Sequence, residues 1–167
     1  TIALPLNFNG TVSLTYNVFD GTTSTGATQS FNVTPVNDAP ELTSDQALLA
    51  PAPEDQDGGY TVNVSDLLEG FSDVDLDSLD IENVVAEDEN GNAFGVTRDG
   101  DIYTIALPLD FNGTVSLTYD VTDGEATIAA DQSFIITPVN DAPTSADSDT
   151  TLLEGETYTF TTTDFPF

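Results

Sequence analysis

The sequence predicts an all-β fold, built as tandem repeats of a Greek-key β-sandwich. Three observations lead to this prediction: side chains that alternate between apolar and polar, turn signals between the alternating runs, and a long internal repeat. Residues 1–40 return at 104–143 without a gap, and 29 of the 40 positions are identical. A repeat this close indicates one structural unit copied in tandem. The offset of 103 residues is the size of an immunoglobulin-type sandwich domain.

Alternation with a period of two marks the expected strands. The alternating runs are residues 60–64, 103–109, 114–121 and 134–136. In the run 114–121, for example, Val115, Leu117 and Tyr119 alternate with Ser116 and Thr118. Such a strand has one face on a core and one in water. β-branched and aromatic residues dominate these runs, as a pleated and half-buried surface favours.

Turn signals separate the runs. They are Asn9-Gly10, Asp20-Gly21, Asn90-Gly91, Asp99-Gly100, Asn112-Gly113 and Asp123-Gly124. Short strands at a spacing of about ten residues indicate a two-sheet Greek-key sandwich. Residues 66–71 are the one place where a helical turn is expected.

Two proline-flanked segments of identical sequence, Pro35–Pro40 and Pro138–Pro143, mark the expected domain boundaries. Proline fixes φ and lacks a backbone donor, so strand pairing stops there and the linker is short and stiff. The predicted units are residues 1–38, the end of a preceding repeat; 39–141, one complete repeat; and 142–167, the start of a following repeat. Either the chain is part of a longer array, or the partial ends of neighbouring molecules complete each other.

Composition excludes several classes of function. The chain has 30 acidic side chains, one basic side chain, no His and no Cys, for a formal net charge of −29. Nucleic acid is excluded as a partner because phosphate binding needs clustered Lys and Arg. Catalysis by His or Cys and zinc sites of Cys and His are excluded because these residues are absent. The sequence contains no run of 18 apolar residues, so no membrane-spanning segment is expected.

The remaining site chemistry is that of oxygen ligands. Carboxylates, Asn amides and backbone carbonyls bind hard cations, calcium above all. Four acidic clusters are candidates: Asn140 and Asp141, with Asn37 and Asp38 as their equivalents; Glu54, Asp55 and Asp57; Asp73, Asp75, Asp77 and Asp80; and Asp120 and Asp123. For each Asp, the competing interpretation is a solvated loop residue that keeps the protein soluble.

The segment from Asp73 to Asp77 is the densest of these clusters. In an extended strand, residues i, i+2 and i+4 share one face, which places Asp73, Asp75 and Asp77 side by side and leaves Val74, Leu76 and Leu79 to face the core. Three like charges at this spacing repel one another by about 1 kcal/mol per pair in water, and a divalent cation reverses that effect. An EF-hand is excluded because its sixth position is Ser78 and its twelfth is Val84.

The motifs together resemble a known family. The linker Val139-Asn-Asp-Ala-Pro143 resembles the NDNxP-type junction of cadherins, and the unit resembles the bacterial cadherin-like repeats of giant surface adhesins, including the VCBS-type and RTX adhesin families. The residues that carry the resemblance are Pro108, Phe111-Asn112-Gly113, Tyr119, Asp123-Gly124, the linker, Glu54-Asp55 and Phe71–Asp75. One departure concerns the glycine-rich DxDGD form of the middle motif, which reads Asp73-Val-Asp75-Leu-Asp77-Ser78 here.

The resemblance implies a cadherin-like β-sandwich, calcium at the junctions between units, secretion by a type I system and a location at the cell surface. Carried over by motif, the calcium ligands are Glu54, Asp73, Asp75, Asp123, Asn140 and Asp141. It further implies a non-enzymatic extender that projects a binding tip for cell adhesion and biofilm formation. The partners expected are then the neighbouring repeats of the same chain.

Three other functions are considered. The first is a subunit of an extracellular filament or sheath, in which identical chains complete one another by donated strands. The second is a sugar-binding module, which the absence of Trp disfavours. The third is a glycoside hydrolase with paired carboxylates, which lacks any marked pair in an apolar pocket.

Overall fold

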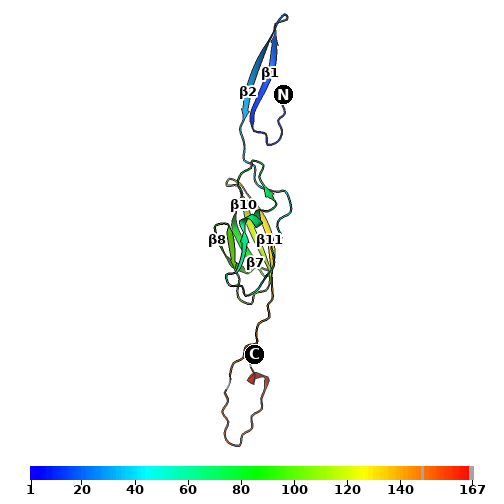
Figure 1. Ribbon diagram of the computed structural model, residues 1–167. Coiled ribbons are helices and arrows are strands. Elements are labelled where there is room, and N and C mark those ends of the chain that lie inside the picture. Colours follow the sequence, from blue (N-terminus) through cyan, green and yellow to red (C-terminus); the bar gives the residue numbers. More distant parts are fainter. Residues whose placement is uncertain (148, 166–167) are drawn as a thin grey trace.

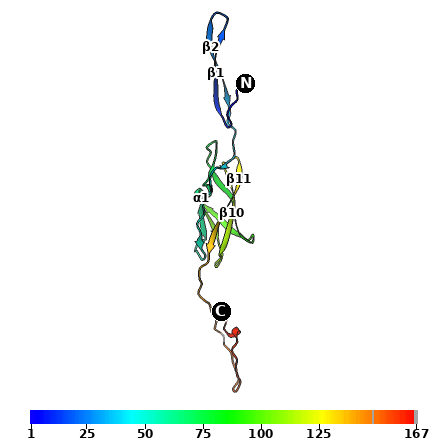
Figure 2. The ribbon, with the colours of Figure 1, turned by 90° about the vertical axis from the view of Figure 1, so that its right-hand side faces the viewer.

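The computed structural model describes residues 1–147 and 149–165. Both ribbon views show three parts in a line (Figures 1 and 2): a long hairpin near the N-terminus, a β-sandwich in the middle and an extended C-terminal segment. The sandwich is the part with a buried core.

The hairpin pairs strands β1 (Gly10–Phe19) and β2 (Ser24–Val33) in antiparallel register. Its turn is closed by Asp20, whose Oδ1 accepts the backbone N–H of Thr22 at 2.8 Å and of Thr23 at 2.7 Å. The same register returns in the sandwich, where Val115 faces Phe134 as Val12 faces Phe31. The two copies of the repeat therefore fold into the same local structure.

The sandwich contains nine strands and one short helix. They are β3 (Glu41–Leu42), β4 (Ala52–Pro53), β5 (Tyr60–Asn63), α1 (Val64–Leu68), β6 (Phe71–Ser72), β7 (Asp80–Asp88), β8 (Ala93–Asp99), β9 (Ile102–Ala106), β10 (Gly113–Thr122) and β11 (Thr127–Thr137). Seven of the strands follow one another in the order β4-β11-β10-β7-β8-β9-β5, and β3 pairs with β6 alone.

The order β10-β7-β8-β9 is a Greek key. Strands β7, β8 and β9 are joined by short turns, and β10 returns to lie beside β7, which is the spatial order 4-1-2-3 of this motif. Strand β8 changes sheets along its length, since Ala93 and Phe94 pair with β7 whereas Gly95 to Asp99 pair with β9. The predicted all-β sandwich is confirmed.

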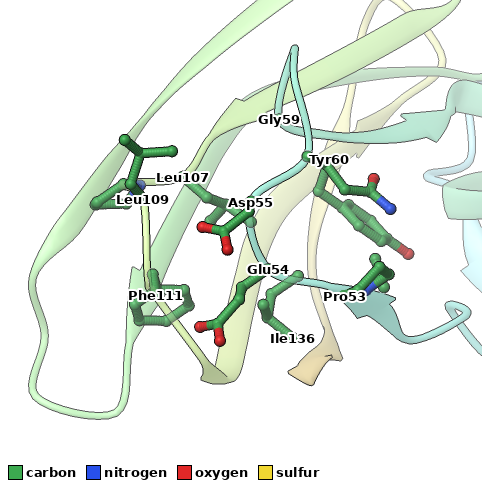
Figure 3. A pocket seen from close by; sticks show the side chains of 12 residues that line it. Pro53, Glu54, Asp55, Gly59, Tyr60, Leu107, Leu109, Phe111 and Ile136 are labelled. Carbon is green, nitrogen blue, oxygen red and sulfur yellow. The ribbon is translucent and has the colours of Figure 1, made fainter. Parts of the chain in front are cut away.

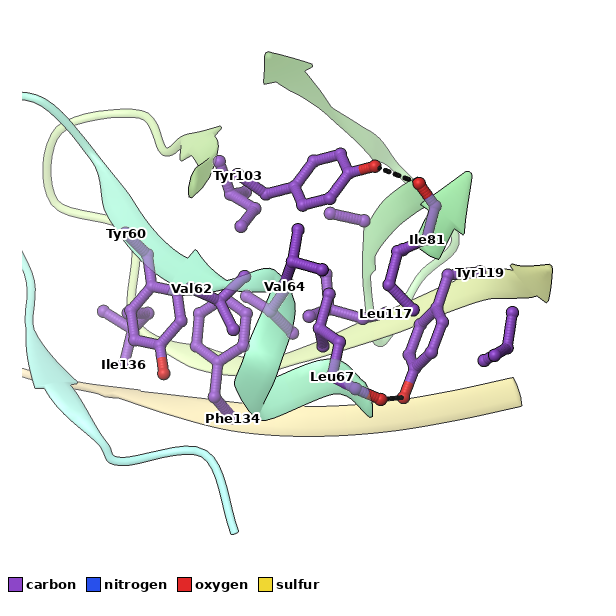
Figure 4. Close-up of a cluster of buried hydrophobic side chains, with 14 residues drawn as sticks. Tyr60, Val62, Val64, Leu67, Ile81, Tyr103, Leu117, Tyr119, Phe134 and Ile136 are labelled. Carbon is purple, nitrogen blue, oxygen red and sulfur yellow. Dashed lines mark hydrogen bonds between the residues drawn. The ribbon is translucent and has the colours of Figure 1, made fainter. Parts of the chain in front are cut away.

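The core lies between the two layers (Figure 4). The inward residues of β10 are almost fully buried: Val115, Leu117 and Val121 are 0 % exposed, and Tyr119 is 2 % exposed. Across the core, the ring of Tyr60 on β5 stacks on that of Phe134 on β11 with centroids 3.7 Å apart. Alternation in the sequence thus reports correctly which side chains form the core.

Two tyrosine hydroxyls reach backbone carbonyls inside the sandwich, and Figure 4 shows both contacts. Tyr103 donates to the carbonyl oxygen of Ile81 at 2.7 Å, and Tyr119 donates to that of Leu67 at 3.1 Å. Each bond satisfies a buried polar group that would otherwise be costly. The second one ties β10 to α1.

Helix α1 ends at a close backbone approach. Gly70 follows it with φ +92, and a Cβ there would lie 2.7 Å from the carbonyl oxygen of Ser44. The Gly70 carbonyl accepts the backbone N–H of Thr43 at 2.8 Å and of Ser44 at 3.2 Å. Only glycine fits this position, which holds the segment before β4 against the helix.

The C-terminal segment has one short 3₁₀ turn at Thr162–Asp164 and no strand among its described residues. Tyr158 and Phe160 pack edge to face, with centroids 5.2 Å apart, and Phe160 is 70 % exposed. Within residues 1–147 and 149–165, no helix has the length and apolar character that a membrane crossing requires.

Some predicted elements differ from the structure. The strand expected at 103–109 ends at Ala106, and Leu109 is 79 % exposed, because Pro108 lacks the donor that pairing needs. The helical turn expected at 66–71 begins earlier, at Val64. Val64 is buried as expected, but on the helix rather than on the preceding strand.

Candidate metal centres at the two linkers

The predicted metal ligands other than Asp120 gather in two groups, one beside each linker. The first-linker cluster contains Asn37, Asp38, Asp73, Asp75, Asp77 and Asp123. The second-linker cluster contains Glu54, Asp55, Asn140 and Asp141. Each cluster holds three carboxylates whose ligand oxygens lie within 4.8 Å of one another, Asp73, Asp75 and Asp77 in the first and Glu54, Asp55 and Asp141 in the second.

The acidic segment of the first cluster is a turn, not the strand that was predicted. Strand β6 ends at Ser72, and the Asp73 Oδ1 accepts the backbone N–H of Asp75 at 2.7 Å and of Asp77 at 3.4 Å. The side chain thus replaces strand pairing, as Asp side chains do in Asx turns. The three carboxylates still converge, because the backbone from Asp75 to Asp77 folds around the Asp73 side chain.

The same turn overturns the predicted core contacts. Val74 is 54 % exposed and Leu76 is 89 % exposed, so neither faces the core. Leu76 has a left-handed backbone with φ +67, which an extended strand does not contain. Leu79 does pack against the core as a partly buried residue.

Asp73 has an oxygen without a donor. Asp73 is only 9 % exposed, and its Oδ2 is buried without a hydrogen-bond partner. A buried acceptor without a partner is costly, and the cost is larger for a charged carboxylate. This atom is therefore the clearest sign that the first cluster fits a cation.

The first linker is hydrogen-bonded to the sandwich at two points. The Asn37 Nδ2 donates to the Asp123 Oδ2 at 2.9 Å, and the Asp38 backbone N–H donates to the Asp75 Oδ2 at 2.8 Å. Hydrogen bonds from the Ala126 backbone, the Asn37 side chain and the Glu125 backbone hold the pKa of Asp123 below its usual value. Asp123 is therefore a firmly ionised acceptor in the β10–β11 turn.

Glu54 is the buried centre of the second cluster. It is 7 % exposed. Its Oε1 accepts the backbone N–H of Val139 at 2.7 Å, and its Oε2 accepts the Asn112 Nδ2 at 2.9 Å. Because Val139 belongs to the second linker, this carboxylate joins the linker to the sandwich.

Asp55 and Asp141 complete the second cluster nearer to solvent. The Asp55 Oδ1 accepts the backbone N–H of Asp110 at 3.0 Å. Desolvation, followed by the negative charges of Asp110, Asp55 and Glu54, raises the pKa of Asp141. These carboxylates thus repel one another, and a cation between them would relieve the repulsion.

The pocket beside Glu54 is small. Glu54 and Asp55 point to the side where Leu109 and Phe111 lie (Figure 3). The cavity volume is about 20 Å³, which accommodates roughly one water molecule or ion. A sugar ring does not fit there.

Three acidic residues of the predicted clusters have other surroundings. Asp120 accepts the Asn83 Nδ2 at 2.8 Å beside an irregularity in the pairing of β7 with β10. Asp80 forms an ion pair with Arg98, with Arg98 Nη2 and Asp80 Oδ1 2.7 Å apart. Asp57 is exposed. None of the three belongs to a metal-compatible group among the described residues.

Asp110 and Asn112 were not predicted as site residues. They follow β9 in the chain but meet Glu54 and Asp55, which lie more than fifty residues earlier. The available signal was the repeat itself, because positions 7 and 110 hold Asn and Asp, both of which offer oxygen ligands. Their placement required the topology of the sandwich.

Comparison with known proteins agrees with this architecture. A family model described as a cadherin-like domain matches residues 36–137. No curated protein matches the chain.

Four solved chains resemble this one. An endo-fucoidan hydrolase from glycoside hydrolase family 107 is 18 % identical over 78 % of this chain and 19 % of that chain, with a TM-score of 0.42. Chimeric titin Z1Z2 carrying an exogenous peptide from decorin is 14 % identical over 80 % of this chain and 63 % of that chain, with a TM-score of 0.31. Titin Z1Z2 in complex with telethonin is 13 % identical over 79 % of this chain and 62 % of that chain, with a TM-score of 0.30. The chain thus spans less than two thirds of each of these structures, and TM-scores this low carry no further argument.

Proposed function

Because this chain belongs to the cadherin-like domain family, we propose that it is an extracellular extender in which calcium at the linkers stiffens tandem β-sandwich units. In this proposal the parent protein is a secreted bacterial adhesin of the VCBS or RTX type, held at the cell surface, which projects a binding tip for adhesion and biofilm formation. The near identity of the two repeat copies supports mechanical reuse of one unit.

The observation that carries the proposal is the unpartnered oxygen of Asp73. This Oδ2 is buried, and the ligand oxygens of Asp75 and Asp77 lie within 4.8 Å. A calcium ion would supply the missing partner, since it takes six to eight oxygen ligands in flexible geometry. The chain offers carboxylates, Asn amides and backbone carbonyls, and its sequence has no His or Cys that would favour zinc.

Stiffening follows from which residues would hold the ion. Asn37 and Asp38 lie in the first linker and already contact Asp123 and Asp75 of the sandwich. A cation bound by linker and sandwich oxygens together would restrict the linker, because bending it would separate the ligands from the ion. At the second linker, Asp141 and Glu54 offer the corresponding pair.

The proposed role is structural rather than enzymatic. The cavity beside Glu54 and Asp55 has a volume of about 20 Å³, on the order of one water molecule or ion, so this acidic pair fits an ion better than a substrate.

Calorimetry tests the proposal. The chain 1–167 would be melted with a chelator and then with calcium in roughly tenfold excess over the millimolar Kd typical of extracellular modules. Binding at a tenfold excess over Kd stabilises the folded state by about 1.4 kcal/mol per site, which for a unit of this size raises Tm by roughly 6–11 °C. Magnesium at the same concentration is the control. Equal Tm values in chelator and calcium would overturn the proposal.

A second candidate is a filament of identical chains. Leu14, Tyr16 and Phe31 are 40 %, 48 % and 41 % exposed, whereas their equivalents Leu117, Tyr119 and Phe134 are at most 2 % exposed. In a longer array the rest of the preceding repeat would cover this face of the hairpin, and in a filament strands donated by an identical chain would cover it. Light scattering across a concentration series tests this candidate, and a monomer at every concentration would contradict it.

A further inference from the structure

The outer face of the layer formed by β5, β9 and β8 is almost free of charge. Side chains alternate along each of these strands, and the inward apolar ones pack in the core. The outward ones form the face: Thr61 and Asn63 on β5; Ile102, Thr104 and Ala106 on β9; and Gly95, Thr97 and Asp99 on β8. Asp99 is the one charged residue among them, in a chain with a formal net charge of −29.

Residues of the three strands lie in register across this neutral face. Thr97 pairs with Thr104, and Thr104 pairs with Thr61, so one row consists of three threonines. The row beside it joins Gly95 to Ala106, where a Cβ on Gly95 would lie 3.8 Å from the Ala106 Cβ. Short side chains of this kind allow a second sheet to pack closely against the face.

The outer face of the opposite layer, formed by β7, β10 and β11, is acidic. Its outward residues include Glu82, Glu87, Asp120 and Asp131. Glu82 and Asp120 lie directly opposite each other in the pairing of β7 with β10. This layer therefore repels a second acidic molecule and attracts a basic one.

Charge selects the partner that fits the neutral face. A basic partner would be drawn to the acidic layer, whereas a second copy of this chain meets the least repulsion at the neutral face. In a two-fold arrangement with antiparallel strands, Asp99 of one copy lies over Gly95 of the other. The two Asp99 side chains are then about 13 Å apart along the strands, beyond the Debye length of about 8 Å in physiological salt.

We propose that two identical chains pack side by side through the neutral face, sheet against sheet, with their threonine rows in contact. Threonine hydroxyls donate and accept hydrogen bonds, so such a row is complementary to itself. The face measures about 10 by 13 Å at the usual strand spacing, well below the roughly 800 Å² per partner of a stable complex. The contact between single units is therefore weak, and tandem units reinforce it. The reinforcement rests on the proposed extender function, whereas the contact itself does not.

Cross-linking of single-cysteine variants tests this contact. The chain has no Cys, and Thr97 and Thr118 are exposed threonines within strands, one on each outer face. Thr97→Cys and Thr118→Cys variants of the full chain 1–167 would be treated with a short bis-maleimide across a concentration series. A monofunctional maleimide measures the reactivity of each thiol. We expect several times more covalent dimer for Thr97→Cys, with a yield that rises with salt as repulsion between the chains is screened.

Charge added to the neutral face provides the matched control. In the Thr97→Cys background, Thr104→Asp should reduce the dimer yield to that of Thr118→Cys, whereas Ser133→Asp on the acidic layer should not. Thr61→Asp, on strand β5, repeats the test if Thr104→Asp unfolds the sandwich.

Two results would overturn the inference: equal yields for the two cysteine variants, as association through the hairpin would give, or a yield that neither Thr104→Asp nor Thr61→Asp reduces. All variants are compared in calcium and in chelator, and the calorimetric response to calcium is measured separately. Failure of this inference and failure of the proposed function are therefore distinguishable.

Discussion

The Asp73 carboxylate accepts a 2.7 Å hydrogen bond from the backbone N–H of Asp75 with one oxygen and leaves the other oxygen buried without a donor. The first oxygen folds the acidic loop, and the second remains available to a ligand. One side chain therefore couples the shape of the loop to its capacity for a cation.

Replacing Asp73 by Asn should remove the first cluster's share of the response to calcium while preserving the turn. The Asn Oδ1 can still accept the Asp75 N–H, but the charge of the buried ligand is lost. We expect the increase in the free energy of unfolding that calcium produces to fall by most of the about 1.4 kcal/mol available per site at a tenfold excess over Kd. Isothermal titration and melting would measure this loss.

The control for that experiment is Asp57→Asn, which removes one exposed charge that belongs to neither metal-compatible group. It should leave the calcium response unchanged. If Asp73→Asn and Asp57→Asn reduce the response equally, then calcium acts through overall charge and not through the first cluster.

Replacing Tyr119 by Phe should destabilise the sandwich. The Tyr119 hydroxyl donates to the Leu67 carbonyl and accepts from the Gln46 Nε2 at 3.0 Å. Loss of the hydroxyl leaves the Leu67 carbonyl without this donor, which costs about 1–3 kcal/mol. Urea denaturation would measure the change, and Tyr16→Phe is a matched control because Tyr16 is the 48 % exposed equivalent in the hairpin. Equal losses in the two variants would contradict this account.

The same tyrosine predicts an alkaline transition. Burial raises the pKa of Tyr119 from 10.0 to about 12. Because the folded pKa lies above the unfolded value, the stabilisation is fully present below pH 10 and is lost as the pH rises towards 12. Denaturation midpoints measured across this window should fall for the parent and fall less for Tyr119→Phe. Parallel curves would show that Tyr119 does not titrate with unfolding.

The core was predictable from sequence because alternation in the strands of the sandwich marks the buried face of each strand. Val115, Leu117 and Tyr119 alternate in the sequence and are buried in the structure. The turn at Asp73 was not predictable in this way, since D-x-D-x-D spacing is compatible with a strand face as well as with an Asx turn. The structure adopts the Asx turn, in which the Asp73 side chain accepts the Asp75 backbone N–H and the Leu76 backbone is left-handed.

The candidate sites were predictable in composition but not in assembly. Asn, Asp and Glu in the linkers and turns indicate oxygen ligands. The meeting of Glu54 with Asn112 and Val139 depends on β4 lying parallel to the end of β11, and such long-range pairing leaves no local pattern. Asp120 was predicted as a ligand from its spacing to Asp123; its side chain accepts a hydrogen bond from Asn83, and its role as a ligand stays a prediction.

Replacing Arg98 by any other residue should lower the free energy of unfolding of the sandwich. The Arg98 Nη1 donates to the Ile81 carbonyl at 2.9 Å, and its Nη2 donates to Asp80 at 2.7 Å. Lysine cannot reproduce this fork, so Arg98→Lys should lower the free energy of unfolding by about 1 kcal/mol, measured by urea denaturation at neutral pH.

Acidic pH should reduce the stability difference between the parent and Arg98→Lys. The hydrogen bond from Arg98 holds the pKa of Asp80 below 3.8. Because the folded pKa is depressed, the stabilisation is present above pH 3.8 and is lost as the pH falls through the folded pKa. Parent and Arg98→Lys should therefore converge in stability in this acidic range. The control is the same Arg98→Lys comparison made in an Asp80→Asn background, where the difference should not change with pH. A difference that stays constant with pH would exclude Asp80 as the relevant partner.

Gly59 and Gly91 allow steric overlap to be separated from backbone strain. Their φ values are +78 and +80, but a Cβ at Gly59 would overlap the carbonyl oxygen of Ile105, whereas a Cβ at Gly91 meets no atom within 4 Å. Both Ala variants should lose about 1–2 kcal/mol for the left-handed conformation. Gly59→Ala should lose a further ~1–3 kcal/mol, since the Tyr60 and Ile105 backbones must move apart. Urea midpoints would measure both losses. Equal losses would mean that the β5–β9 pair shifts without cost, and the close approach at Gly59 would then not be what fixes β5 beside the Glu54 pocket.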